Sequence, residues 1–458
     1  MCESCIAWVS CGSVVGKSSE FVERSKSMCV CEHQTESSAE KMPSPMASFF
    51  MYEGPAFPSP ESLLACRSLQ RLAPLKEPMA QFYSELGLHR QLRSHPSRVY
   101  DAEKAELFYV PVLPHLDSDA GGCNGTRHKE RMRAVATHLR SSPHWQRRNG
   151  TDHFYACTCV MMKGMLTNEL WSLLSTAVHS VHSVPRGNAS PSRCQLAIPY
   201  YNPTFASGEQ ALVWREPGRP RPTLAHFRGR VMNRVRAALV RTYGGAAGHV
   251  IEAAHPSTAA RCNLNKCGEK ALANARFPRQ EEHLAEMTKS LFCLVPVGDS
   301  PPSSRLYLAV AAGCLPVIIS DGFEGAFSDL VPWDTFSVRI REARVAGPGR
   351  ARRGGAKRAA PVPVALPLNL TKHLLDIAND APRLRQMQEA LRVHAVDVLW
   401  EAPGSRVGSH TLGLATRAAR DVCRPRTGAV ASLASPVPPP PPPPGADPAR
   451  QQIIFRPV

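Results

Sequence analysis

Alternation between apolar runs and turn residues is clearest at residues 291–320, where it predicts a strand, a loop, a helix and a second strand. Leu291–Val295 is a short apolar run bounded by a proline, which is typical of a buried strand. Residues 297–302 include a glycine, an aspartate, a serine and two prolines, so the chain turns there. Ser303–Ala312 predicts a helix. Leu315–Ile319 is apolar at successive positions, as in a strand buried on both faces.

The predicted helix has its own start and stop signals. Ser300 is a good N-cap, and the prolines after it suit a first helical turn, because the N–H groups that they lack have no partner there. Gly313 can adopt the left-handed conformation that ends a helix. A strand, a crossover helix and a parallel strand form one unit of a doubly wound sheet, so the pattern predicts the α/β class.

The loop before this helix is a candidate anion site. In doubly wound sheets ligands bind at the carboxyl ends of the strands, and this loop lies at such an end. It offers backbone N–H groups at a helix N-terminus, hydroxyl groups and Arg305. An ordinary strand–helix–strand unit without a ligand fits the same residues, which leave both interpretations open.

The same stretch resembles the signature of the exostosin family of glycosyltransferases. The family pattern S-x-F-C-L-x-P-x-G-D-S-P-S-S-x-R-L-F-[ED]-A-x-x-A-G-C-I-P-V matches most positions from Ser290 to Val317. Other family blocks follow in family order at Met51–Pro55, Ala105–Pro111, residues 144–154, Ile198–Tyr200, Phe227–Gly229 and residues 327–338. The resemblance therefore covers roughly residues 49–340.

This resemblance implies the GT-B architecture, in which two Rossmann-like domains face a cleft. We expect an N-terminal acceptor domain at residues 49–210 and a nucleotide-sugar domain at residues 211–400. Residues 1–48 are rich in Cys and Ser, and residues 401–458 are expected to form a Pro-rich tail. The last helix of the fold is expected at Arg383–Trp400, where apolar residues recur at helical spacing.

The resemblance also implies transfer of a sugar from a nucleotide-sugar donor, expected to be a UDP-sugar, to a glycan or glycoprotein acceptor. Transfer is expected to be inverting and to need no metal or other cofactor, and a homo- or hetero-oligomer of glycosyltransferases is an expected assembly. Helix N-termini and arginines would neutralise the diphosphate leaving group. The donor-binding candidates are Arg228, Gly229, Gly298, Asp299, Ser300, Ser303, Ser304, Arg305 and Gly313.

Candidates for the catalytic base lie in the expected acceptor domain. Asp152 and His153 belong to the block 150–154, and a histidine oriented by a carboxylate is a competent base. A structural role, in which the pair holds a loop, fits equally well. His115 is a second candidate, because it lies just after the predicted strand Leu107–Val112, at the carboxyl end of that strand.

One departure from the family pattern bears on activity. The family has an acid after the Phe of R-L-F, whereas this chain has Leu308 after Tyr307. An acid there would suit a hydrogen bond to a ribose hydroxyl, and a lost bond of this kind costs about 1–3 kcal/mol. A non-catalytic family member that binds glycan is therefore an alternative.

The net charge of +17 raises a second alternative, a nucleic-acid-binding protein. Part of the charge lies in Arg341–Arg358, which holds seven Arg or Lys residues and one acid among Gly, Ala and Pro. Residues 341–360 are therefore expected to form a disordered basic insert. The chain has no recognisable nucleic-acid-binding motif, so we expect no nucleic-acid partner.

Family members usually occupy the Golgi membrane, although no stretch here has the roughly 18 apolar residues of a membrane-spanning helix. The sequons at Asn124, Asn149, Asn188 and Asn369 favour a lumenal location.

Fifteen cysteines are an unusually high number. Cys262 with Cys267, and Cys157 or Cys159 with Cys194, are possible disulfides. Cys293 and Cys314, which lie in or beside predicted buried strands, are expected to be plain core thiols.

Overall fold

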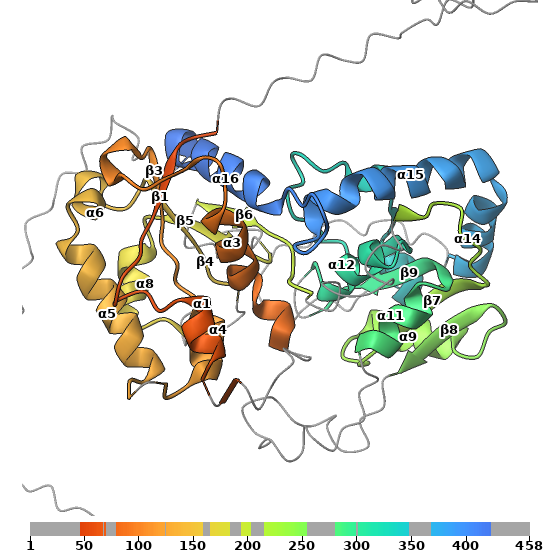
Figure 1. Cartoon of the computed structure of the whole chain (residues 1–458). Coiled ribbons are helices and arrows are strands. Elements are labelled where there is room, and N and C mark those ends of the chain that lie inside the picture. The colour runs from red at the N-terminus through yellow and green to blue at the C-terminus, as the bar shows by residue number, and fades with distance from the viewer. Residues whose placement is uncertain are drawn as a thin grey trace, which may run out of the picture. The chain divides into compact units, whose positions relative to one another are not determined.

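The structure is a computed structural model, and it describes residues 46–66, 68–69, 79–123, 125–158, 165–183, 194–202, 215–253, 280–298, 301–347 and 368–422. Within these ranges the chain forms two β-sheets with flanking helices (Figure 1). Every strand pair in both sheets is parallel. This confirms the α/β class.

The first sheet has the strand order β2-β1-β3-β4-β5-β6. Its strands are β1 (Phe49–Met51), β2 (Arg98–Val99), β3 (Leu107–Tyr109), β4 (His153–Ala156), β5 (Val178–Val181) and β6 (Gln195–Ala197). The helices among them are α1 (Pro60–Leu64), η1 (Met79–Phe82), α3 (Ser84–Arg93), η2 (Ala102–Lys104), α4 (Pro114–Ala120), α5 (His128–Ser141), α6 (Pro143–Arg148) and α8 (Asn168–Leu174). Strands β3, β4 and β5 are buried at every position, as expected for a parallel sheet covered on both faces.

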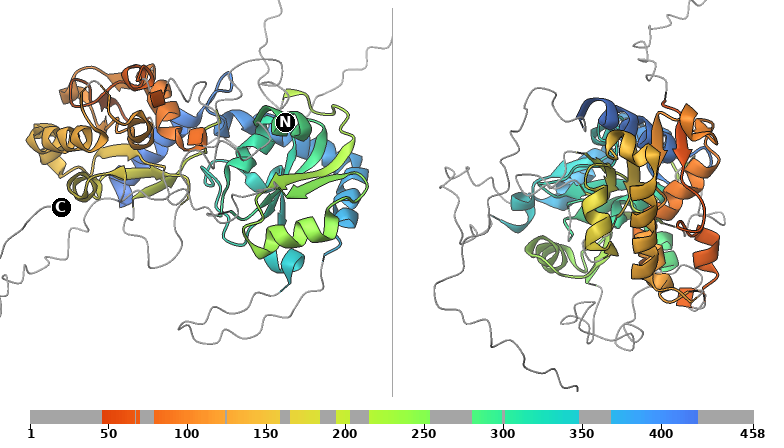
Figure 2. Two further views of the ribbon diagram at one scale, coloured as in Figure 1. Left: turned by 90° about the horizontal axis from the view of Figure 1, so that it is seen from below. Right: turned by 90° about the vertical axis from the view of Figure 1, so that its left-hand side faces the viewer.

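The second sheet has the order β11-β10-β9-β7-β8. Its strands are β7 (Thr223–Gly229), β8 (His249–Ala253), β9 (Ser290–Pro296), β10 (Leu315–Ile319) and β11 (Val338–Ile340). Its helices are α9 (Arg234–Tyr243), α11 (Gln280–Met287), α12 (Ser304–Ala311), η6 (Trp333–Thr335) and α13 (Glu342–Ala346), followed by α14 (Leu370–Asn379) and α15 (Ala381–Val398). Figure 2 shows helices on both sides of these strands.

The strand–helix–strand unit predicted at residues 291–320 is confirmed as β9, α12 and β10. The helix begins later than expected. Ser303 is its N-cap, with extended backbone dihedrals, whereas Ser300 lies outside the described residues. Gly313 ends the helix with a φ of 60°, as predicted.

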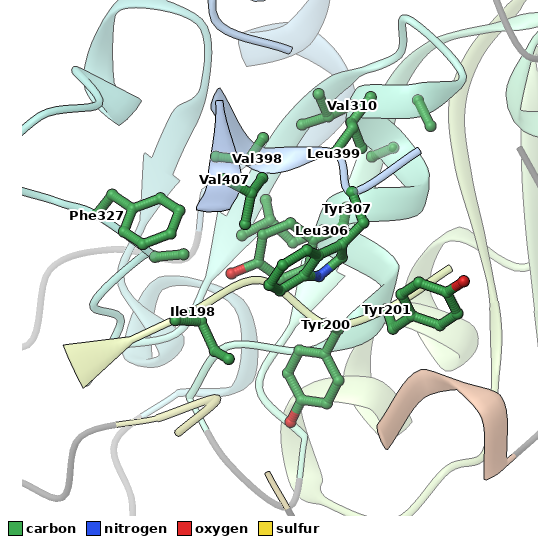
Figure 3. Close-up of a cluster of buried hydrophobic side chains, with 14 of the residues drawn as sticks. Ile198, Tyr200, Tyr201, Leu306, Tyr307, Val310, Phe327, Val398, Leu399 and Val407 are labelled. Atoms are coloured by element: carbon green, nitrogen blue, oxygen red, sulfur yellow. The ribbon is translucent and has the colours of Figure 1, made fainter. Parts of the chain in front are cut away.

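A single hydrophobic cluster contains residues of both sheets. Figure 3 shows part of it, where Ile198 and Tyr200 after β6 lie near Leu306 and Tyr307 of α12. The Trp400 indole N–H donates to the carbonyl oxygen of Pro199 at 3.1 Å. The two sheets are therefore joined by packed side chains as well as by the chain itself.

The expected tail at residues 401–458 contains regular structure. Residues Val407–Arg417 form α16, and a π-helical turn follows at Ala418–Val422. Buried Val407, Leu412 and Ala415 pack into the main cluster, so the helix contributes to the core. The prediction was wrong for 407–422 because the prolines farther along dominate the composition of the segment.

An ionic cluster fixes α16 to α15. The carboxylate of Asp397 in α15 accepts hydrogen bonds from Arg406 at 2.6 and 2.9 Å. His394 and His410 each place a ring nitrogen within 2.9 Å of the same carboxylate. These partners outweigh burial and hold the pKa of Asp397 well below its usual value.

The expected basic insert at 341–360 begins as ordered structure. Residues Glu342–Ala346 form α13, and the Glu342 N–H donates to the side chain of Asp321 at 3.0 Å. The Leu368 N–H donates to the carbonyl oxygen of Arg344 at 3.0 Å. Backbone bonds of this kind fix residues 341–347, whereas residues 348–367 lie outside the described residues. The expected domain boundary near residue 210 also lies outside them.

The expectation that Cys293 and Cys314 are plain thiols was wrong, because they form a disulfide. Cys293 lies in β9 and Cys314 directly precedes β10. These neighbouring parallel strands bring the two Cα atoms to 5.7 Å, within the bridging range. Cys66 and Cys123 form another disulfide. Cys194 is also disulfide-bonded, while Cys159, Cys262 and Cys267 lie outside the described residues.

Candidate active site

The strand order places a candidate site at the carboxyl ends of β7 and β9. From β7 the chain proceeds outward to β8 on one side, whereas β9, β10 and β11 lie on the other side. The strand order therefore reverses between β7 and β9. In open α/β sheets ligands bind outside the carboxyl ends of the strands at such a reversal. Arg228, Gly229, Val297 and Gly298 lie at this point.

Arg305 is held beside the end of β7. Its guanidinium donates from Nη2 to the carbonyl oxygen of Arg228 at 2.9 Å and lies 4.9 Å from the ring centre of Phe227. Burial, and then the positive charge of Arg236, lower the pKa of Arg305. Within the described residues no carboxylate forms an ion pair with Arg305. A positive group in this setting is suited to bind an anion.

Gly229 makes room for this guanidinium. A Cβ atom at residue 229 would lie 2.5 Å from Nη2 of Arg305 and 3.3 Å from the ring of Phe227. Any side chain there would displace Arg305. The structure therefore gives Gly229, a predicted donor-binding residue, a specific reason to be glycine.

The N-terminus of α12 adds neutral donors to the site. Ser303 makes no side-chain cap bond, and its Oγ is buried without a partner among the described residues. Ser304 is the first residue of the helix and is partly buried. A helix N-terminus with free N–H groups and a nearby arginine is a typical anion site. Ser303, Ser304 and Arg305 thus lie together, as the sequence predicted.

Two residues that sequence reasoning missed fix the loop after β9. Asn233 donates from its side chain to the carbonyl oxygen of Val297 at 2.8 Å, and Arg236 donates from Nε to the same oxygen at 3.1 Å. Arg236 also donates to the carbonyl oxygen of Arg230 at 3.1 Å. Asn233 is the N-cap of α9 as well. In the sequence, an asparagine before a helix indicates only an N-cap at Asn233. It does not predict the hydrogen bond from Asn233 to Val297.

Arg228 is engaged by acids. Its guanidinium lies 2.9 Å from a carboxylate oxygen of Glu252 and 2.8 Å from one of Glu286, and the side chain is 15% exposed. Its charge is therefore compensated within the protein. Among the described residues Arg305 has no such acidic partners, so the two arginines differ in charge compensation, and the role of each in binding phosphate stays a prediction.

The remaining donor-binding candidates divide by position. Gly298 is partly buried at the carboxyl end of β9, beside the site. Asp299 and Ser300 lie outside the described residues. Gly313 follows the last turn of α12, at the end opposite Ser303, and its N–H donates to the carbonyl oxygen of Val310 at 2.9 Å. Gly313 therefore ends the helix, at the end away from Ser303, and its predicted part in donor binding stays a prediction.

Leu308, which stands in the place of the family's acid, lies one turn after Arg305 on α12. It is partly buried and packs against the main hydrophobic cluster. Its side chain offers no hydrogen bond to a ligand at the start of the helix.

Asp152 and His153 form a buried pair at the amino end of β4. The His153 ring places Nδ1 2.8 Å from Asp152 and Nε2 3.0 Å from the Tyr52 hydroxyl, so both ring nitrogens have partners. His153 has no exposed surface and stacks on Phe108 at 4.7 Å. Burial lowers the pKa of His153. The pair therefore lies at the edge of the sheet opposite the carboxyl ends where ligands bind in such sheets, and its predicted catalytic role stays a prediction.

His115 does lie at the carboxyl edge of the first sheet. It follows β3 and stacks on Phe82 with ring centres 4.9 Å apart. It is 3% exposed, and its Nδ1 has no partner in the described part of the chain. Burial, and to a lesser extent His128, lower the pKa of His115 to about 4. The imidazole is therefore neutral at neutral pH, with a lone pair available.

His182, after β5, joins His115 around Phe82. Its ring stacks on Tyr200 at 3.6 Å, and its Nε2 lies 2.7 Å from Oγ of Ser84. The Ser84 hydroxyl donates its only proton to the carbonyl oxygen of Pro199 at 2.7 Å, so Nε2 of His182 must donate to Ser84. Nδ1 then carries the lone pair, and it has no partner among the described residues.

The spacing of His179 and His182, three residues apart, is also typical of one exposed face of a helix. Residues Val178–Val181 are instead the buried strand β5, and His182 directly follows it. The apolar run around the histidines was too short to separate the two states by periodicity.

Within the described residues no three His, Cys, Asp or Glu side chains are grouped as metal ligands. The same residues contain no helix with the length and apolar character needed to cross a bilayer.

Comparisons with known proteins agree with this geometry. The model of the exostosin GT47 domain matches residues 45–353, more than half of the chain. A probable glucuronosyltransferase of Oryza sativa subsp. japonica is 29% identical over 277 residues, covering 58% of this chain and 59% of that protein. A probable beta-1,4-xylosyltransferase of Arabidopsis thaliana is 28% identical over 277 residues, covering 58% and 62%.

A probable glucuronosyltransferase of Physcomitrium patens is likewise 28% identical over 277 residues, covering 58% of each chain. The chain thus spans about three fifths of the length of the curated relatives that it matches. The family match includes both sheets and the start of α12. On these grounds the chain belongs to the exostosin GT47 family.

Proposed function

We propose that this chain is a glycosyltransferase that moves a sugar from a nucleotide diphosphate, most simply UDP, to a hydroxyl group of a glycan or glycoprotein. The observation that carries the proposal is Arg305, which lies without an acidic partner among the described residues at the strand-order reversal of the second sheet. The relatives' names, glucuronosyltransferase and beta-1,4-xylosyltransferase, support the reaction class.

The diphosphate would lie against the first turn of α12. The N–H groups at the start of the helix, the Ser303 hydroxyl and the Arg305 guanidinium would neutralise the charge that develops on the leaving phosphate. These groups supply the electrostatic stabilisation that a metal ion provides in other transferases. We therefore propose transfer without a metal.

Inverting transfer would proceed in one displacement. The acceptor oxygen forms a bond to the anomeric carbon, while the bond from that carbon to the phosphate oxygen breaks and its electron pair leaves with the diphosphate. The hydroxyl proton must pass to a base. We propose that the acceptor lies against the carboxyl edge of the first sheet, as in a GT-B arrangement with a cleft, and that His115 is the base.

Titration calorimetry with UDP and other nucleoside diphosphates tests the donor site. Arg305→Gln should weaken UDP binding by at least about tenfold, whereas Arg228→Gln should change it less than about threefold, because Arg228 is already paired with Glu252 and Glu286. Equal losses in both variants would contradict the assignment of Arg305. No binding of any nucleoside diphosphate, together with no hydrolysis of a panel of nucleotide sugars, would overturn the proposal itself.

A second candidate function is a family member that binds glycan without transferring sugar. Leu308 favours it, because a leucine cannot bond to a ribose hydroxyl. This candidate predicts glycan binding in the absence of nucleoside diphosphate binding, so the same titrations separate the two functions.

We propose a location in the lumen of the secretory pathway, in the Golgi apparatus. Disulfides form and persist in oxidising compartments, and the described residues include Cys66–Cys123 and Cys293–Cys314. Asn149 of one sequon is exposed. Expression in secreting cells should give a protein whose mass falls on treatment with peptide-N-glycosidase, and an unchanged mass would count against a lumenal location.

A further inference from the structure

A cavity of about 790 Å³ opens at the carboxyl end of β1, within the first sheet's own helices. Its floor is the loop of residues 52–59 together with Pro111 after β3. Its walls include His89 and Arg93 of α3 and Glu130 and Ala134 of α5. We call it the β1 pocket. Its volume lies within the range of roughly 300–1,000 Å³ that is typical of ligand pockets.

The position of the β1 pocket in the topology is that of a binding site. β1 pairs with β2 on one side and with β3 on the other. The strand order of the first sheet therefore reverses between β1 and β3, as it does between β7 and β9 in the second sheet. The carboxyl ends of strands at such a reversal form a crevice where ligands bind.

The apolar part of the wall includes several rings. Tyr52 and Phe57 lie with ring centres 5.5 Å apart, and Pro55, Pro58 and Pro111 line the same cavity. The Tyr52 hydroxyl is held by Ser142 at 3.1 Å and by His153 at 3.0 Å. The buried pair of Asp152 and His153 thus fixes the orientation of a ring in the wall. Tyr52 and Phe57 are only 4% and 6% exposed, so the rings of Pro55 and Pro58 supply the accessible apolar surface that can pack against the C–H faces of a pyranose.

The polar part of the wall is rich in carboxylates whose charge is balanced. Glu61 pairs with Arg93 at 3.0 Å, and Glu53 pairs with Arg98 at 2.6 Å. Glu130 pairs with Arg127, whose Nε lies 3.6 Å from its carboxylate and whose backbone N–H donates to it at 2.7 Å. Paired carboxylates still have free lone pairs for hydroxyl donors. Because their charge is compensated, they give the pocket no preference for an anion.

His89 adds a buried polar group that lacks a partner. Its side chain lines the pocket and the residue is 8% exposed, and Nδ1 has no hydrogen-bond partner in the described chain. Burial, the largest influence, lowers the pKa of His89 to about 4, so the ring is neutral at neutral pH. A neutral imidazole can exchange hydrogen bonds with a hydroxyl group of a ligand.

We propose that the β1 pocket binds a neutral sugar unit of a glycan chain, at a subsite separate from the nucleotide site of the second sheet. Ring faces for the C–H surface and charge-balanced carboxylates for the hydroxyl groups together match an uncharged saccharide. The identification of this glycan with the acceptor rests on the proposed function, whereas binding of the saccharide does not.

Calorimetric titration of the full chain with β-1,4-xylotetraose and β-1,4-glucotetraose tests the proposal. Ala134 is exposed on α5 and lines the pocket, so Ala134→Trp should fill the opening without disturbing the core. Thr137→Trp is the matched control, because residue 137 is exposed on the same helix and does not line the cavity. We expect at least one tetrasaccharide to bind, Ala134→Trp to weaken that binding at least about tenfold, and the control to stay within about twofold.

The rim provides a second test that leaves the cavity open. Glu61→Gln removes the carboxylate that faces Arg93 at an exposed position, and we expect it to weaken saccharide binding while thermal unfolding stays within a few degrees of wild type. Absence of binding by both tetrasaccharides, or equal binding by wild type and Ala134→Trp, would overturn the proposal.

Titration of the same samples with UDP tests saccharide binding by the β1 pocket separately from the proposed transfer reaction. Saccharide binding that depends on residue 134, without any nucleoside diphosphate binding, would support the β1 pocket and count against transfer. Nucleoside diphosphate binding together with unaltered saccharide binding in Ala134→Trp would count against the β1 pocket alone.

Discussion

At the scale of single residues, the candidate site depends on one guanidinium and the space left for it. Arg305 bonds to the main-chain oxygen of Arg228 and lies over Phe227, and Gly229 lacks the side chain that would displace it. Arg228 and Arg305 have the same chemistry, yet only the first is neutralised by neighbouring acids in the described structure. What distinguishes them is their partners.

Gly229→Ala should therefore impair the donor site more than the fold. The added methyl group would lie 2.5 Å from the end of the flexible Arg305 side chain, which can move away at modest cost. We expect UDP affinity to fall about tenfold while the free energy of unfolding changes by less than about 1 kcal/mol. Gly413→Ala, where nothing lies within 4 Å of the new atom, is the control for calorimetry and urea unfolding. Unchanged UDP affinity in Gly229→Ala would show that the position of Arg305 does not matter for binding.

Leu308→Glu restores the acid of the family pattern. If that carboxylate reaches a ribose hydroxyl, UDP affinity should rise about tenfold, since one such hydrogen bond is worth about 1–3 kcal/mol. Leu375→Glu, which adds an acid at a 42% exposed position of α14, controls for the change in net charge. Titration calorimetry compares the two variants, and an unchanged or weaker affinity in Leu308→Glu would contradict the placement of this side chain.

At the scale of elements, a single arginine ties two helices to the second sheet. Arg221 precedes β7 and donates to the carbonyl oxygens of Thr288, Ser290 and Ala312 at 3.0–3.1 Å. Thr288 directly follows the last residue of α11, and Ala312 is the C-cap of α12. A cation at two helix C-termini satisfies carbonyl groups that no helical N–H can reach. The orientation of α12, and with it the candidate site, depends on this contact.

Arg221→Ala should lower the free energy of unfolding by about 2 kcal/mol, because hydrogen bonds from a charged group are lost and buried carbonyl groups lose their partner. Arg219→Ala removes an exposed arginine two residues earlier, whose partner is Glu216 at 3.3 Å, and should cost less than about 1 kcal/mol. Urea unfolding of both variants measures the difference. Similar stabilities would mean that water replaces Arg221 at these carbonyl groups.

At the scale of the whole molecule, buried histidines make the fold sensitive to acid. Burial is the main cause that lowers the pKa values of His89, His115, His179 and His226 to about 4, and it also holds the pKa of His182 well below its ordinary value. In the unfolded chain each of these groups titrates near its ordinary value of about 6.5. The unfolded state therefore binds more protons below about pH 6.5, and stability falls as the pH drops through this window.

We expect each of these histidines to remove about 1 kcal/mol of stability between about pH 7.5 and about pH 5.5, and the five together on the order of 5 kcal/mol. Urea unfolding across this range measures the loss. His179→Gln should reduce the pH dependence by the share of one histidine, since His179 is buried in β5 with its Nε2 3.1 Å from the carbonyl oxygen of Cys157. A flat stability profile in wild type would contradict the buried neutral state of these rings.

The sequence by itself determined the local pattern of the second sheet. Periodicity and turn residues predicted β9, α12, β10 and α15 to within a few residues, because these segments are long, strongly apolar and bounded by Gly, Pro or Ser. The family blocks located Ser303, Ser304, Arg305 and Gly229, which the structure brings together. The sequence therefore predicted residues that lie within or beside a strand–helix–strand unit with a strong apolar pattern.

Only the tertiary structure decided which of these side chains are already engaged by other residues and which remain able to bind a ligand. The acids that neutralise Arg228 and the partner of Cys293 lie 21 or more residues away along the chain, and so does Tyr52, which occupies the second nitrogen of His153. No local pattern encodes those contacts, because they arise when separate segments pack against one another. The same reason explains why the β1 pocket, formed by the ends of two strands and the sides of three helices, left no motif in the sequence.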